Sequence, residues 1–245
     1  MEEIPMIDTL HLNNPNVLMV AHRGLSGLEL ENTASAFVAA GNRSYFGIET
    51  DVHRTADGKY ILIHDDNTKR VAADEMIVEK TTFDTLRAIR LVDHDGEKSR
   101  RDLIMPSLDE YIKICKKYDK TAVLELKNYF DPMYVDEIID IIRNIGWLER
   151  TVFISFNLPN MICIRERLPQ QPAQFLTSKF HDWILETLVK YDLDLDIDYR
   201  NITAEQVKMV HDAGHKVNVW TVNTLEDAQR MVDYGVDFIT TNIVE

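Results

Sequence analysis

The sequence predicts an α/β protein built as one (β/α)8 barrel, the TIM-barrel architecture. Short β-branched runs alternate with helix-period segments along nearly the whole chain, and this repetition is typical of parallel strands covered by helices. The length of 245 residues suits a single large domain of this kind. No Pro-, Gly- or Ser-rich linker divides the chain, so we expect residues 1–245 to form one domain.

The extended runs number one more than a barrel of eight strands needs. They are Val17–Ala21, Gly47–Val52, Tyr60–His64, Thr121–Leu126, Val152–Ser155, Ala173–Thr177, Leu193–Ile197, Lys216–Thr221 and Val236–Thr241. The second and third are separated by a short segment containing Asp57-Gly58, which is too short for a parallel crossover and typical of a hairpin. We therefore predict that Tyr60–His64 is an antiparallel flap on the second strand, which leaves eight parallel strands.

Helical patterns lie between most of these runs. The clearest are Glu31–Ala40, Ser107–Tyr118, Asp131–Asn144, Ala204–Asp212 and Leu225–Asp233. A glycine follows four of the patterns, where a left-handed cap favours that residue: Gly41, Gly146, Gly214 and Gly235. Ser107 and Glu110 have the spacing of a capping box. An open doubly wound sheet is the alternative, but it usually has a glycine-rich first turn, and Gly24-Leu-Ser-Gly27 is too sparse.

Two segments depart from a regular barrel. Residues 65–106 form a charged stretch after the flap, which we expect to be a small inserted lobe over the barrel mouth, with one helix near Thr82–Arg90. The sequence has no helical pattern after the eighth strand. The seam beside the eighth strand would therefore lack a covering helix. We expect residues 1–16 to pack at that seam through five apolar side chains: Ile4, Met6, Ile7, Leu10 and Leu12.

Composition narrows the classes of partner. Acidic residues outnumber basic ones by 41 to 27, and the formal charge of −14 disfavours nucleic acid but not a small anion in a local cationic pocket. No apolar run is long enough to cross a bilayer, so no membrane insertion is expected. The acidic N-terminus lacks the basic residues of a secretory signal, and Cys115 and Cys163 fit buried thiols. These features predict a cytoplasmic protein.

Polar side chains gather where predicted strands end. His22 and Arg23 follow the first strand, Glu49 and Asp51 end the second, and His64 ends the flap. The next strand ends in Glu125-Leu-Lys127, where the period of two puts Glu125 and Lys127 on one face. Carboxyl ends of barrel strands converge on one mouth, where active sites are found.

Glu49, Asp51 and Glu125 would repel one another in a partly buried pocket, and a divalent cation resolves this repulsion. Ligands that are all oxygen favour one Mg²⁺ or Ca²⁺ ion over zinc, and such an ion can polarise a phosphoryl oxygen. Arg23 and Lys127 can neutralise the remaining phosphate charge. The sequence therefore predicts a metal-assisted site for a phosphate group.

Two histidines at the same mouth supply a proton acceptor and a proton donor. His22 and His64 can take a proton from the attacking oxygen and give one to the departing alkoxide. Any one of these groups alone is more often part of an ion pair, whereas the joint set favours a site for phosphoester chemistry. The remaining histidines are interpreted as structural: His11, His53, His94, His181, His211 and His215.

Two further features are less decisive. Four aspartates alternate with apolar residues over Asp192–Asp198, and a solvated strand end is expected for most of them, with one or two able to join the acidic mouth. Trp220 is either a core residue or a substrate-facing wall of the site, because it directly precedes Thr-Val-Asn223.

An ordered set of motifs spans nearly the whole chain. These are His22-Arg-Gly24, Glu31-Asn-Thr33 followed by Ala36-Phe37, Ile48-Glu-Thr-Asp-Val52, Thr55-Ala-Asp-Gly58, His64-Asp65, Pro106-Ser-Leu-Asp-Glu110, Leu124-Glu-Leu-Lys127, Ser155-Phe156 and Trp220-Thr-Val-Asn223. In this combination the chain resembles the glycerophosphodiester phosphodiesterase family. One departure is Leu30, where the family usually has proline.

The resemblance implies a barrel that hydrolyses small-molecule glycerophosphodiesters to sn-glycerol 3-phosphate and an alcohol. It implies His22 and His64 as the acid/base pair and Arg23 and Lys127 as phosphate binders. The implied metal ligands are Glu49, Asp51 and Glu125. The segment 65–106 would correspond to the family's small capping subdomain.

Two other functions compete with this hypothesis. Lys127 could act as a base in an enolising or aldol-type reaction on a phosphorylated sugar, but this leaves the two histidines without a joint role. A catalytically silent binding protein is the second alternative. For a phosphodiesterase, both the alcohol group and the choice between water and the glycerol 2-hydroxyl as attacking group remain open.

Overall fold

The computed structural model describes residues 8–13 and 16–245. In this part of the chain, eight parallel strands close into a barrel in the order β1-β9-β8-β7-β6-β5-β4-β2, with β1 paired to β2. β3 pairs antiparallel with β2, so both the (β/α)8 barrel and the flap are confirmed. The strands are β1 Leu18–Ala21, β2 Gly47–Arg54, β3 Tyr60–Leu62, β4 Thr121–Leu126, β5 Thr151–Ser155, β6 Ala173–Thr177, β7 Asp194–Asp198, β8 Val217–Trp220 and β9 Phe238–Thr241.

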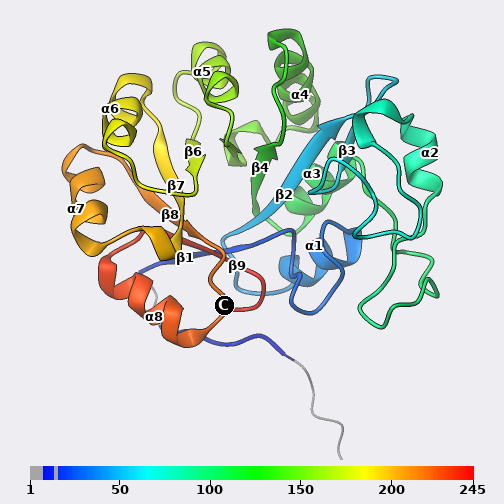
Figure 1. The fold of residues 1–245 in the computed structure, drawn as a ribbon, viewed down its shortest axis with the longest axis horizontal. Coiled ribbons are helices and arrows are strands. Elements are labelled where there is room, and N and C mark those ends of the chain that lie inside the picture. Colours follow the sequence, from blue (N-terminus) through cyan, green and yellow to red (C-terminus); the bar gives the residue numbers. More distant parts are fainter. Residues whose placement is uncertain (1–7, 14–15) are drawn as a thin grey trace, which may run out of the picture.

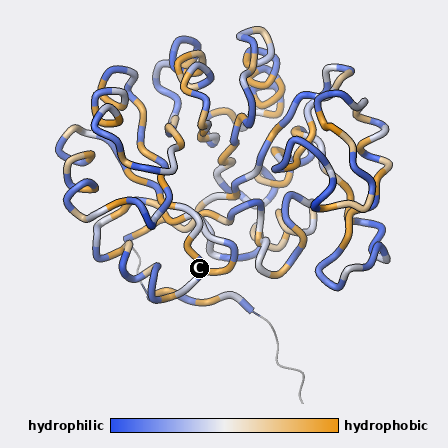
Figure 2. The backbone as a smooth tube through the Cα atoms, in the orientation of Figure 1, coloured by the Kyte–Doolittle hydropathy of each residue, from blue (hydrophilic) through white to orange (hydrophobic). Residues whose placement is uncertain are grey.

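Helices surround the strands, and α4 to α8 follow one another around the barrel in Figure 1. The helices are α1 Ala34–Gly41, α2 Phe83–Ala88, α3 Leu108–Lys117, α4 Pro132–Ile145, α5 Leu158–Arg167, α6 Asp182–Tyr191, α7 Ala204–Asp212 and α8 Leu225–Tyr234. Short 3-10 turns are η1 Val78–Lys80, η2 Leu148–Arg150 and η3 Tyr199–Asn201. Hydrophobic and hydrophilic positions alternate along the helices in Figure 2, as expected for helices with one buried face.

Each barrel strand presents alternate side chains to the helices and to the barrel interior. On β7, Leu195 and Ile197 pack in the large core beneath the helices, and Asp196 between them faces inward. A separate apolar cluster fills part of the interior: Val20, Val123, Val152, Ile154, Leu176 and Phe238. The barrel is therefore a packed core and not a pore, as is usual for this fold.

Most of the predicted helix ends are confirmed. Gly146, Gly214 and Gly235 have φ angles of 73°, 91° and 83°, and Ser107 forms the capping box with Glu110. Gly41 differs, because it is the last residue of α1 and does not have a positive φ. A Cβ there would lie 2.6 Å from the ring of Tyr118, so close packing of α1 against that ring explains the glycine.

Residues 65–106 fold against the flap and have a small apolar core of their own. Ile61 of β3 and the neighbouring Ile63 join side chains from the segment, among them Val78, Leu86 and Leu103. The helix expected near Thr82–Arg90 is present as α2.

The N-terminal segment lies beside the last residues of the chain. Leu10 forms a parallel bridge with Val244, and Leu12 packs against the barrel core. The predicted packing is therefore confirmed for Leu12. Leu10 lies at the seam through its backbone, but 38% of its surface remains exposed. The predicted contacts of Ile4, Met6 and Ile7 lie outside the described residues.

Two expectations from composition are tested directly. Cys115 and Cys163 are both buried and unpaired, as predicted. Among the described residues, no helix has the length and apolar character needed to cross a membrane.

Candidate active site

Three acidic side chains from two neighbouring strands meet at the barrel mouth. Asp51 on β2 is the register partner of Glu125 on β4, and Glu49 lies two residues earlier on the same face of β2. Oxygen atoms of Glu49, Asp51 and Glu125 all lie within 4.8 Å of one another. Each residue is at most 6% exposed, so the cluster is buried as well as close. The predicted convergence of the three carboxylates is confirmed.

The electrostatics of this cluster follow from burial and mutual repulsion. Burial and the charges of Asp51 and Glu125 raise the pKa of Glu49 well above its usual value. Burial and Asp51 raise the pKa of Glu125 to about 7. Burial also opposes ionisation of Asp51, but the charges of Lys127 and Arg23 outweigh it and hold that pKa below its usual range. A compact set of hard oxygen donors with unrelieved repulsion fits a divalent cation such as Mg²⁺ or Ca²⁺.

Arg23 and Lys127 flank the carboxylates. Lys127 Nζ lies 2.9 Å from Glu125 Oε1 and 3.3 Å from Asp51 Oδ1. Arg23 Nε lies 3.6 Å from Asp51 Oδ2, and the Arg23 backbone N–H donates to Glu49 Oε2 at 2.8 Å. Arg23 adopts a left-handed φ of 55°, which is uncommon for a residue with a side chain and typical of strained functional turns. Both cations thus lie beside the carboxylate cluster.

The ionisation of Lys127 bears on one of the competing functions. Burial lowers the pKa of Lys127, but the charges of Asp51 and Glu125 outweigh burial and raise it above its usual value. A lysine that serves as a base needs a lowered pKa, because only the neutral amine accepts a proton. In the absence of a cation, these two carboxylates therefore hold Lys127 in its charged form.

His22 is held in one orientation by a distant residue. Its Nδ1 lies 2.7 Å from Asn242 Oδ1, and because an amide oxygen only accepts, Nδ1 carries the proton. This leaves Nε2 as the acceptor nitrogen of the neutral ring. Burial and the positive charge of Arg23 lower the pKa of His22 to about 4. The ring is therefore neutral at physiological pH.

His64 is held by its neighbour in sequence. Its Nδ1 donates to Asp65 Oδ1 at 2.6 Å, and Asp65 in turn accepts a hydrogen bond from Arg70 Nε at 2.7 Å. Burial lowers the pKa of His64, and the repulsion of Arg23 and Lys127 adds to this while Asp51 opposes it. Both predicted histidines thus line the cavity with the ring held by a hydrogen bond at Nδ1.

Other polar residues, to which the sequence analysis assigned no function, contact the carboxylates, the cations and the histidines of the site. Asn32, with a left-handed φ of 52°, donates through Nδ2 to Asp51 Oδ2 at 2.8 Å and accepts from Thr50 at 2.6 Å. Glu31 accepts from Arg23 at 2.9 Å and from Arg70 at 2.7 Å. Glu31 and Asn32 belong to the Glu31-Asn-Thr33 motif, one of those that carry the family resemblance, so the sequence did point to them. Asn242 carries no such signal.

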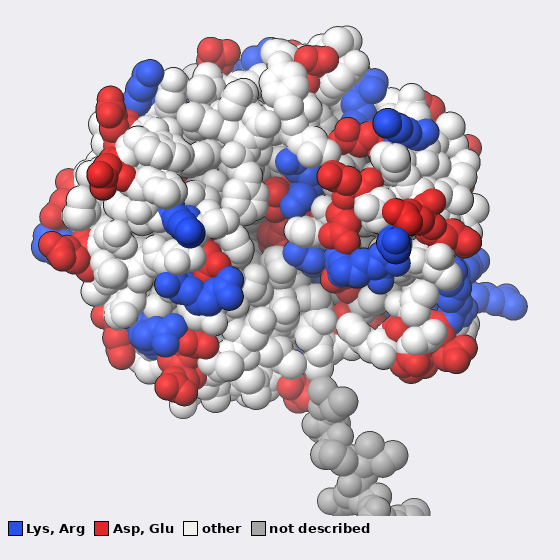
Figure 3. Space-filling model, in the orientation of Figure 1, with Lys and Arg blue, Asp and Glu red and all other residues white. Residues whose placement is uncertain are grey.

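One cavity of about 220 Å³ at the mouth is lined by His22, Arg23, Glu49, His64 and Glu125. Its wall includes Trp220, whose ring meets Phe156 edge to face at a centroid distance of 5.7 Å. Figure 3 shows basic and acidic side chains intermingled around the centre of the same face. Trp220 is therefore a wall of the cavity and not part of the core beneath the helices.

The solvated strand end expected for most of the aspartates in Asp192–Asp198 fits Asp192, which is exposed, and is wrong for Asp196 and Asp198, which are buried. Asp192 ends α6 in a left-handed conformation, and Asp194 accepts a hydrogen bond from the backbone of Lys216. Asp198 is buried and pairs with Arg200. Asp196 is 2% exposed and lines the cavity, so it does join the acidic mouth. The alternation reflects a polar barrel interior.

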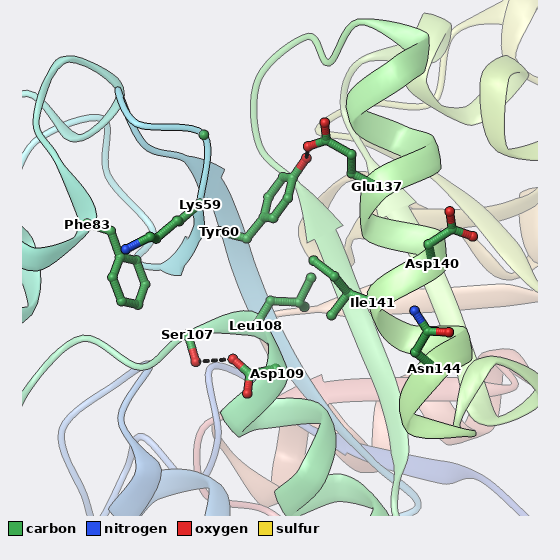
Figure 4. A pocket seen from close by; sticks show the side chains of 11 residues that line it. Lys59, Tyr60, Phe83, Ser107, Leu108, Asp109, Glu137, Asp140, Ile141 and Asn144 are labelled. Atoms are coloured by element: carbon green, nitrogen blue, oxygen red, sulfur yellow. Dashed lines mark hydrogen bonds between the residues drawn. The ribbon is translucent and has the colours of Figure 1, made fainter.

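A larger cavity of about 700 Å³ lies elsewhere, between the flap, α3 and α4 (Figure 4). Its polar side chains are engaged with one another, as when Tyr60 donates to Glu137 and Ser107 donates to Asp109. It is lined by no histidine and by none of the three clustered carboxylates. The smaller cavity holds groups able to do chemistry, so it is the candidate active site despite its size.

The remaining histidines occupy structural positions where the structure gives them partners. His53 is buried near Glu79 and the backbone of His64, and His211 pairs with Asp237 at 2.8 Å. His11 lies 3.3 Å from Glu245. His53, His94, His181, His211 and His215 are not among the lining residues of the cavity.

Comparison with known proteins decides the family. A model described as the glycerophosphoryl diester phosphodiesterase family matches residues 22–245. The chain belongs to this family. A glycerophosphodiester phosphodiesterase of Caldanaerobacter subterraneus is 30% identical over 92% of this chain and 93% of its own length. The family match and such relatives make the chain a hydrolase of the glycerophosphodiester phosphodiesterase kind.

Solved structures of glycerophosphodiester phosphodiesterases share the fold. One from Parabacteroides distasonis has a TM-score of 0.76 and 26% identity, with 93% of each chain covered. A phosphodiesterase of Oleispira antarctica, solved in complex with the product sn-glycerol-3-phosphate, has a TM-score of 0.81. It is 24% identical, with 92% of each chain covered. The resemblance inferred from sequence motifs and the barrel fold are both confirmed.

Proposed function

We propose that this glycerophosphodiester phosphodiesterase uses one Mg²⁺ or Ca²⁺ ion and two histidines to release sn-glycerol 3-phosphate and an alcohol. The observation that carries the proposal is the buried cluster of Glu49, Asp51 and Glu125, of which Glu49 and Glu125 line the same cavity as His22 and His64. The product named for the Oleispira phosphodiesterase supports the substrate class.

Glu49, Asp51 and Glu125 would hold the cation. A bound divalent cation supplies Lewis-acid polarisation of a phosphoryl oxygen. The carboxylates orient that ion, and Asn32 fixes the direction of Asp51 through its 2.8 Å hydrogen bond. Arg23 and Lys127 bind the other phosphoryl oxygens, since both cations flank the cluster.

His22 and His64 carry the protons. With Nδ1 donating to Asn242, the neutral His22 ring accepts a proton at Nε2, so it acts as the base toward the attacking oxygen. His64 acts as the acid toward the leaving alkoxide in its doubly protonated form, which Asp51 and the 2.6 Å hydrogen bond to Asp65 stabilise against the effect of burial. Trp220 forms a wall against which the substrate packs.

Residues 65–106 form the capping lobe of a single domain. Support comes from Arg70, which binds Asp65 beside His64 and also Glu31 beside Arg23. Through these contacts the lobe restrains both side chains at the edge of the cavity. The barrel and lobe therefore act together on the substrate.

The test is a panel of glycerophosphodiesters assayed with Mg²⁺, Ca²⁺ and Mn²⁺ while glycerol 3-phosphate is measured. We expect release of glycerol 3-phosphate that excess EDTA abolishes, and loss of turnover in both His22→Ala and His64→Ala. An exposed histidine, varied as His94→Ala, is the matched control. Full activity in EDTA, or an unimpaired variant at either histidine of the site, would exclude this mechanism.

A further inference from the structure

Two buried polar atoms of opposite character line the cavity without a protein partner. Within the described part of the chain, Asp196 Oδ1 accepts no hydrogen bond and Trp220 Nε1 donates none. Arg23 Nε and Glu125 Oε1 also lack a hydrogen bond, but each lies beside an opposite charge of the carboxylate cluster. Asp196 and Trp220 have no such counterpart, and the proposed metal and proton-transfer groups do not use them.

The two residues are neighbours on the inner face of the barrel. Asp198 on β7 is the register partner of Trp220 on β8, and Asp196 lies one inward-facing position before Asp198. Asp196 is 2% exposed and lines the same cavity as Trp220, together with the apolar side chains of Ile154 and Leu176. Both side chains therefore border one cavity of about 220 Å³, which also has apolar walls.

The surrounding interior offers Asp196 nothing else. Its register partner Asn218 donates to Gln174 at 3.1 Å and accepts from Thr240 at 3.1 Å, so these three side chains satisfy one another. A buried carboxyl without a partner destabilises the folded protein, and such groups are rare in native interiors. Burial and the nearby Glu125 raise the pKa of Asp196 well above its usual value, consistent with the lack of a compensating charge.

An acceptor, Asp196 Oδ1, and a donor, Trp220 Nε1, together favour binding of a hydroxyl group over binding of a cation. A hydroxyl both donates and accepts, so one or two hydroxyls satisfy Asp196 Oδ1 and Trp220 Nε1 together. An ammonium group only donates and would leave the indole N–H without an acceptor. A trimethylammonium group would satisfy neither atom.

We propose that Asp196 and Trp220 form a subsite that binds the free terminal hydroxyl of the substrate's glyceryl group. This inference rests on the proposed function, in which every substrate carries a glyceryl group whatever its other alcohol. The terminal hydroxyl is farthest from the phosphorus and takes no part in either route of attack. The subsite would therefore determine specificity for glycerol, and Asp196 would act by positioning it.

The variant Asp196→Leu removes the carboxyl group and Trp220→Phe removes the indole N–H, and each leaves an apolar side chain in its place. The matched control is Asp198→Asn, on the same strand but outside the cavity lining. The substrates are glycerophosphocholine and its analogue with propane-1,2-diol in place of glycerol, which lacks only the terminal hydroxyl. For glycerophosphocholine, we expect each subsite variant to lower kcat/KM by about tenfold or more. For the analogue, the loss in kcat/KM should be at least severalfold smaller, because it has no terminal hydroxyl whose hydrogen bonds could be lost.

Equal losses on both substrates would overturn the proposal, because they would indicate a structural role. A loss confined to diesters whose leaving alcohol carries hydroxyls would overturn the assignment to the glyceryl group. Binding of sn-glycerol 3-phosphate, measured by calorimetry against propane-1,2-diol phosphate, gives a readout besides turnover. If the wild-type protein is inactive on all diesters, the proposed function fails. The subsite is then still judged by whether Asp196→Leu abolishes the preference for sn-glycerol 3-phosphate.

Discussion

At the scale of single residues, the site is governed by charges that the fold forces together. Glu49 and Glu125 have raised pKa values because burial and neighbouring carboxylates oppose their ionisation. Asp51 stays ionised because Lys127 and Arg23 outweigh its burial. His22 stays neutral because burial and Arg23 oppose a positive charge on its ring. The same arrangement that prepares the site for a cation and a phosphate therefore reduces the stability of the metal-free protein.

The variant Glu49→Gln separates these two effects. We expect it to weaken Mg²⁺ binding and lower kcat/KM on the order of 100-fold or more, because a cation ligand is lost. In EDTA, the same variant should unfold with a free energy about 1 kcal/mol higher than the wild type, because a buried repulsion is removed. Calorimetry and urea unfolding measure the two quantities, with Asp140→Asn on the exposed face of α4 as control. Mg²⁺ affinity equal to the wild type would contradict the ligand assignment.

His22 predicts a pH dependence of stability. Its pKa is about 4 in the folded protein and 6.5 in the unfolded chain, so the unfolded chain binds more protons between these values. Stability is therefore unaffected above pH 6.5 and falls as the pH decreases toward 4, by at most about 3 kcal/mol. Unfolding free energies in EDTA should decline less steeply for His22→Gln than for the wild type or His94→Gln. Parallel declines would show that His22 does not contribute.

At the scale of elements, strand ends and tight turns hold the site. The sequence predicted that Glu49 and Asp51 share a face because β2 is a regular buried strand of period two. It did not reveal the roles of Asn242 or Asp196, whose meaning depends on partners far away in sequence or on the barrel interior. Within residues 65–106, only α2 was foreseen, because that lobe is organised by contacts with Ile61 and Ile63 rather than by its own periodicity.

The turn after β1 provides a test at this scale. Gly24 has a φ of 78°, and a Cβ there would lie 2.7 Å from the backbone carbon of Ala36 in α1. We expect Gly24→Ala to destabilise the protein by about 2–4 kcal/mol through strain and overpacking together. The control Gly214→Ala has a φ of 91° but open space around the added carbon, so it should cost only about 1 kcal/mol. Urea unfolding compares them, and equal costs would show that the contact with α1 is unimportant.

At the scale of the whole molecule, the barrel joins distant segments around one cavity. Order and parallel direction of the strands were predictable, because alternating strand and helix patterns constrain a chain of this length to few folds. The cavity itself was not predictable, since its shape depends on Phe156, Leu176 and Trp220 from three different strands or their ends. Gly41 was misjudged for a similar reason, because the ring of Tyr118 that requires it comes from another element.

A bound cation should stabilise the entire fold, since its ligands come from β2 and β4, which pair along their length. Mg²⁺ or Ca²⁺ at 100 times its dissociation constant should raise the unfolding free energy by about 2.7 kcal/mol. Thermal unfolding with increasing cation concentration measures this, and Glu125→Gln should reduce the response. An unchanged midpoint across all concentrations would argue against a cation site in the folded protein.

The guanidinium of Arg70 binds Glu31 and Asp65 at once, and these two carboxylates hold Arg23 and His64. Displacement of this one side chain would therefore release a phosphate binder and a proton donor in the same event. Loosening of the lobe, for example at high ionic strength, should therefore weaken substrate binding and turnover together.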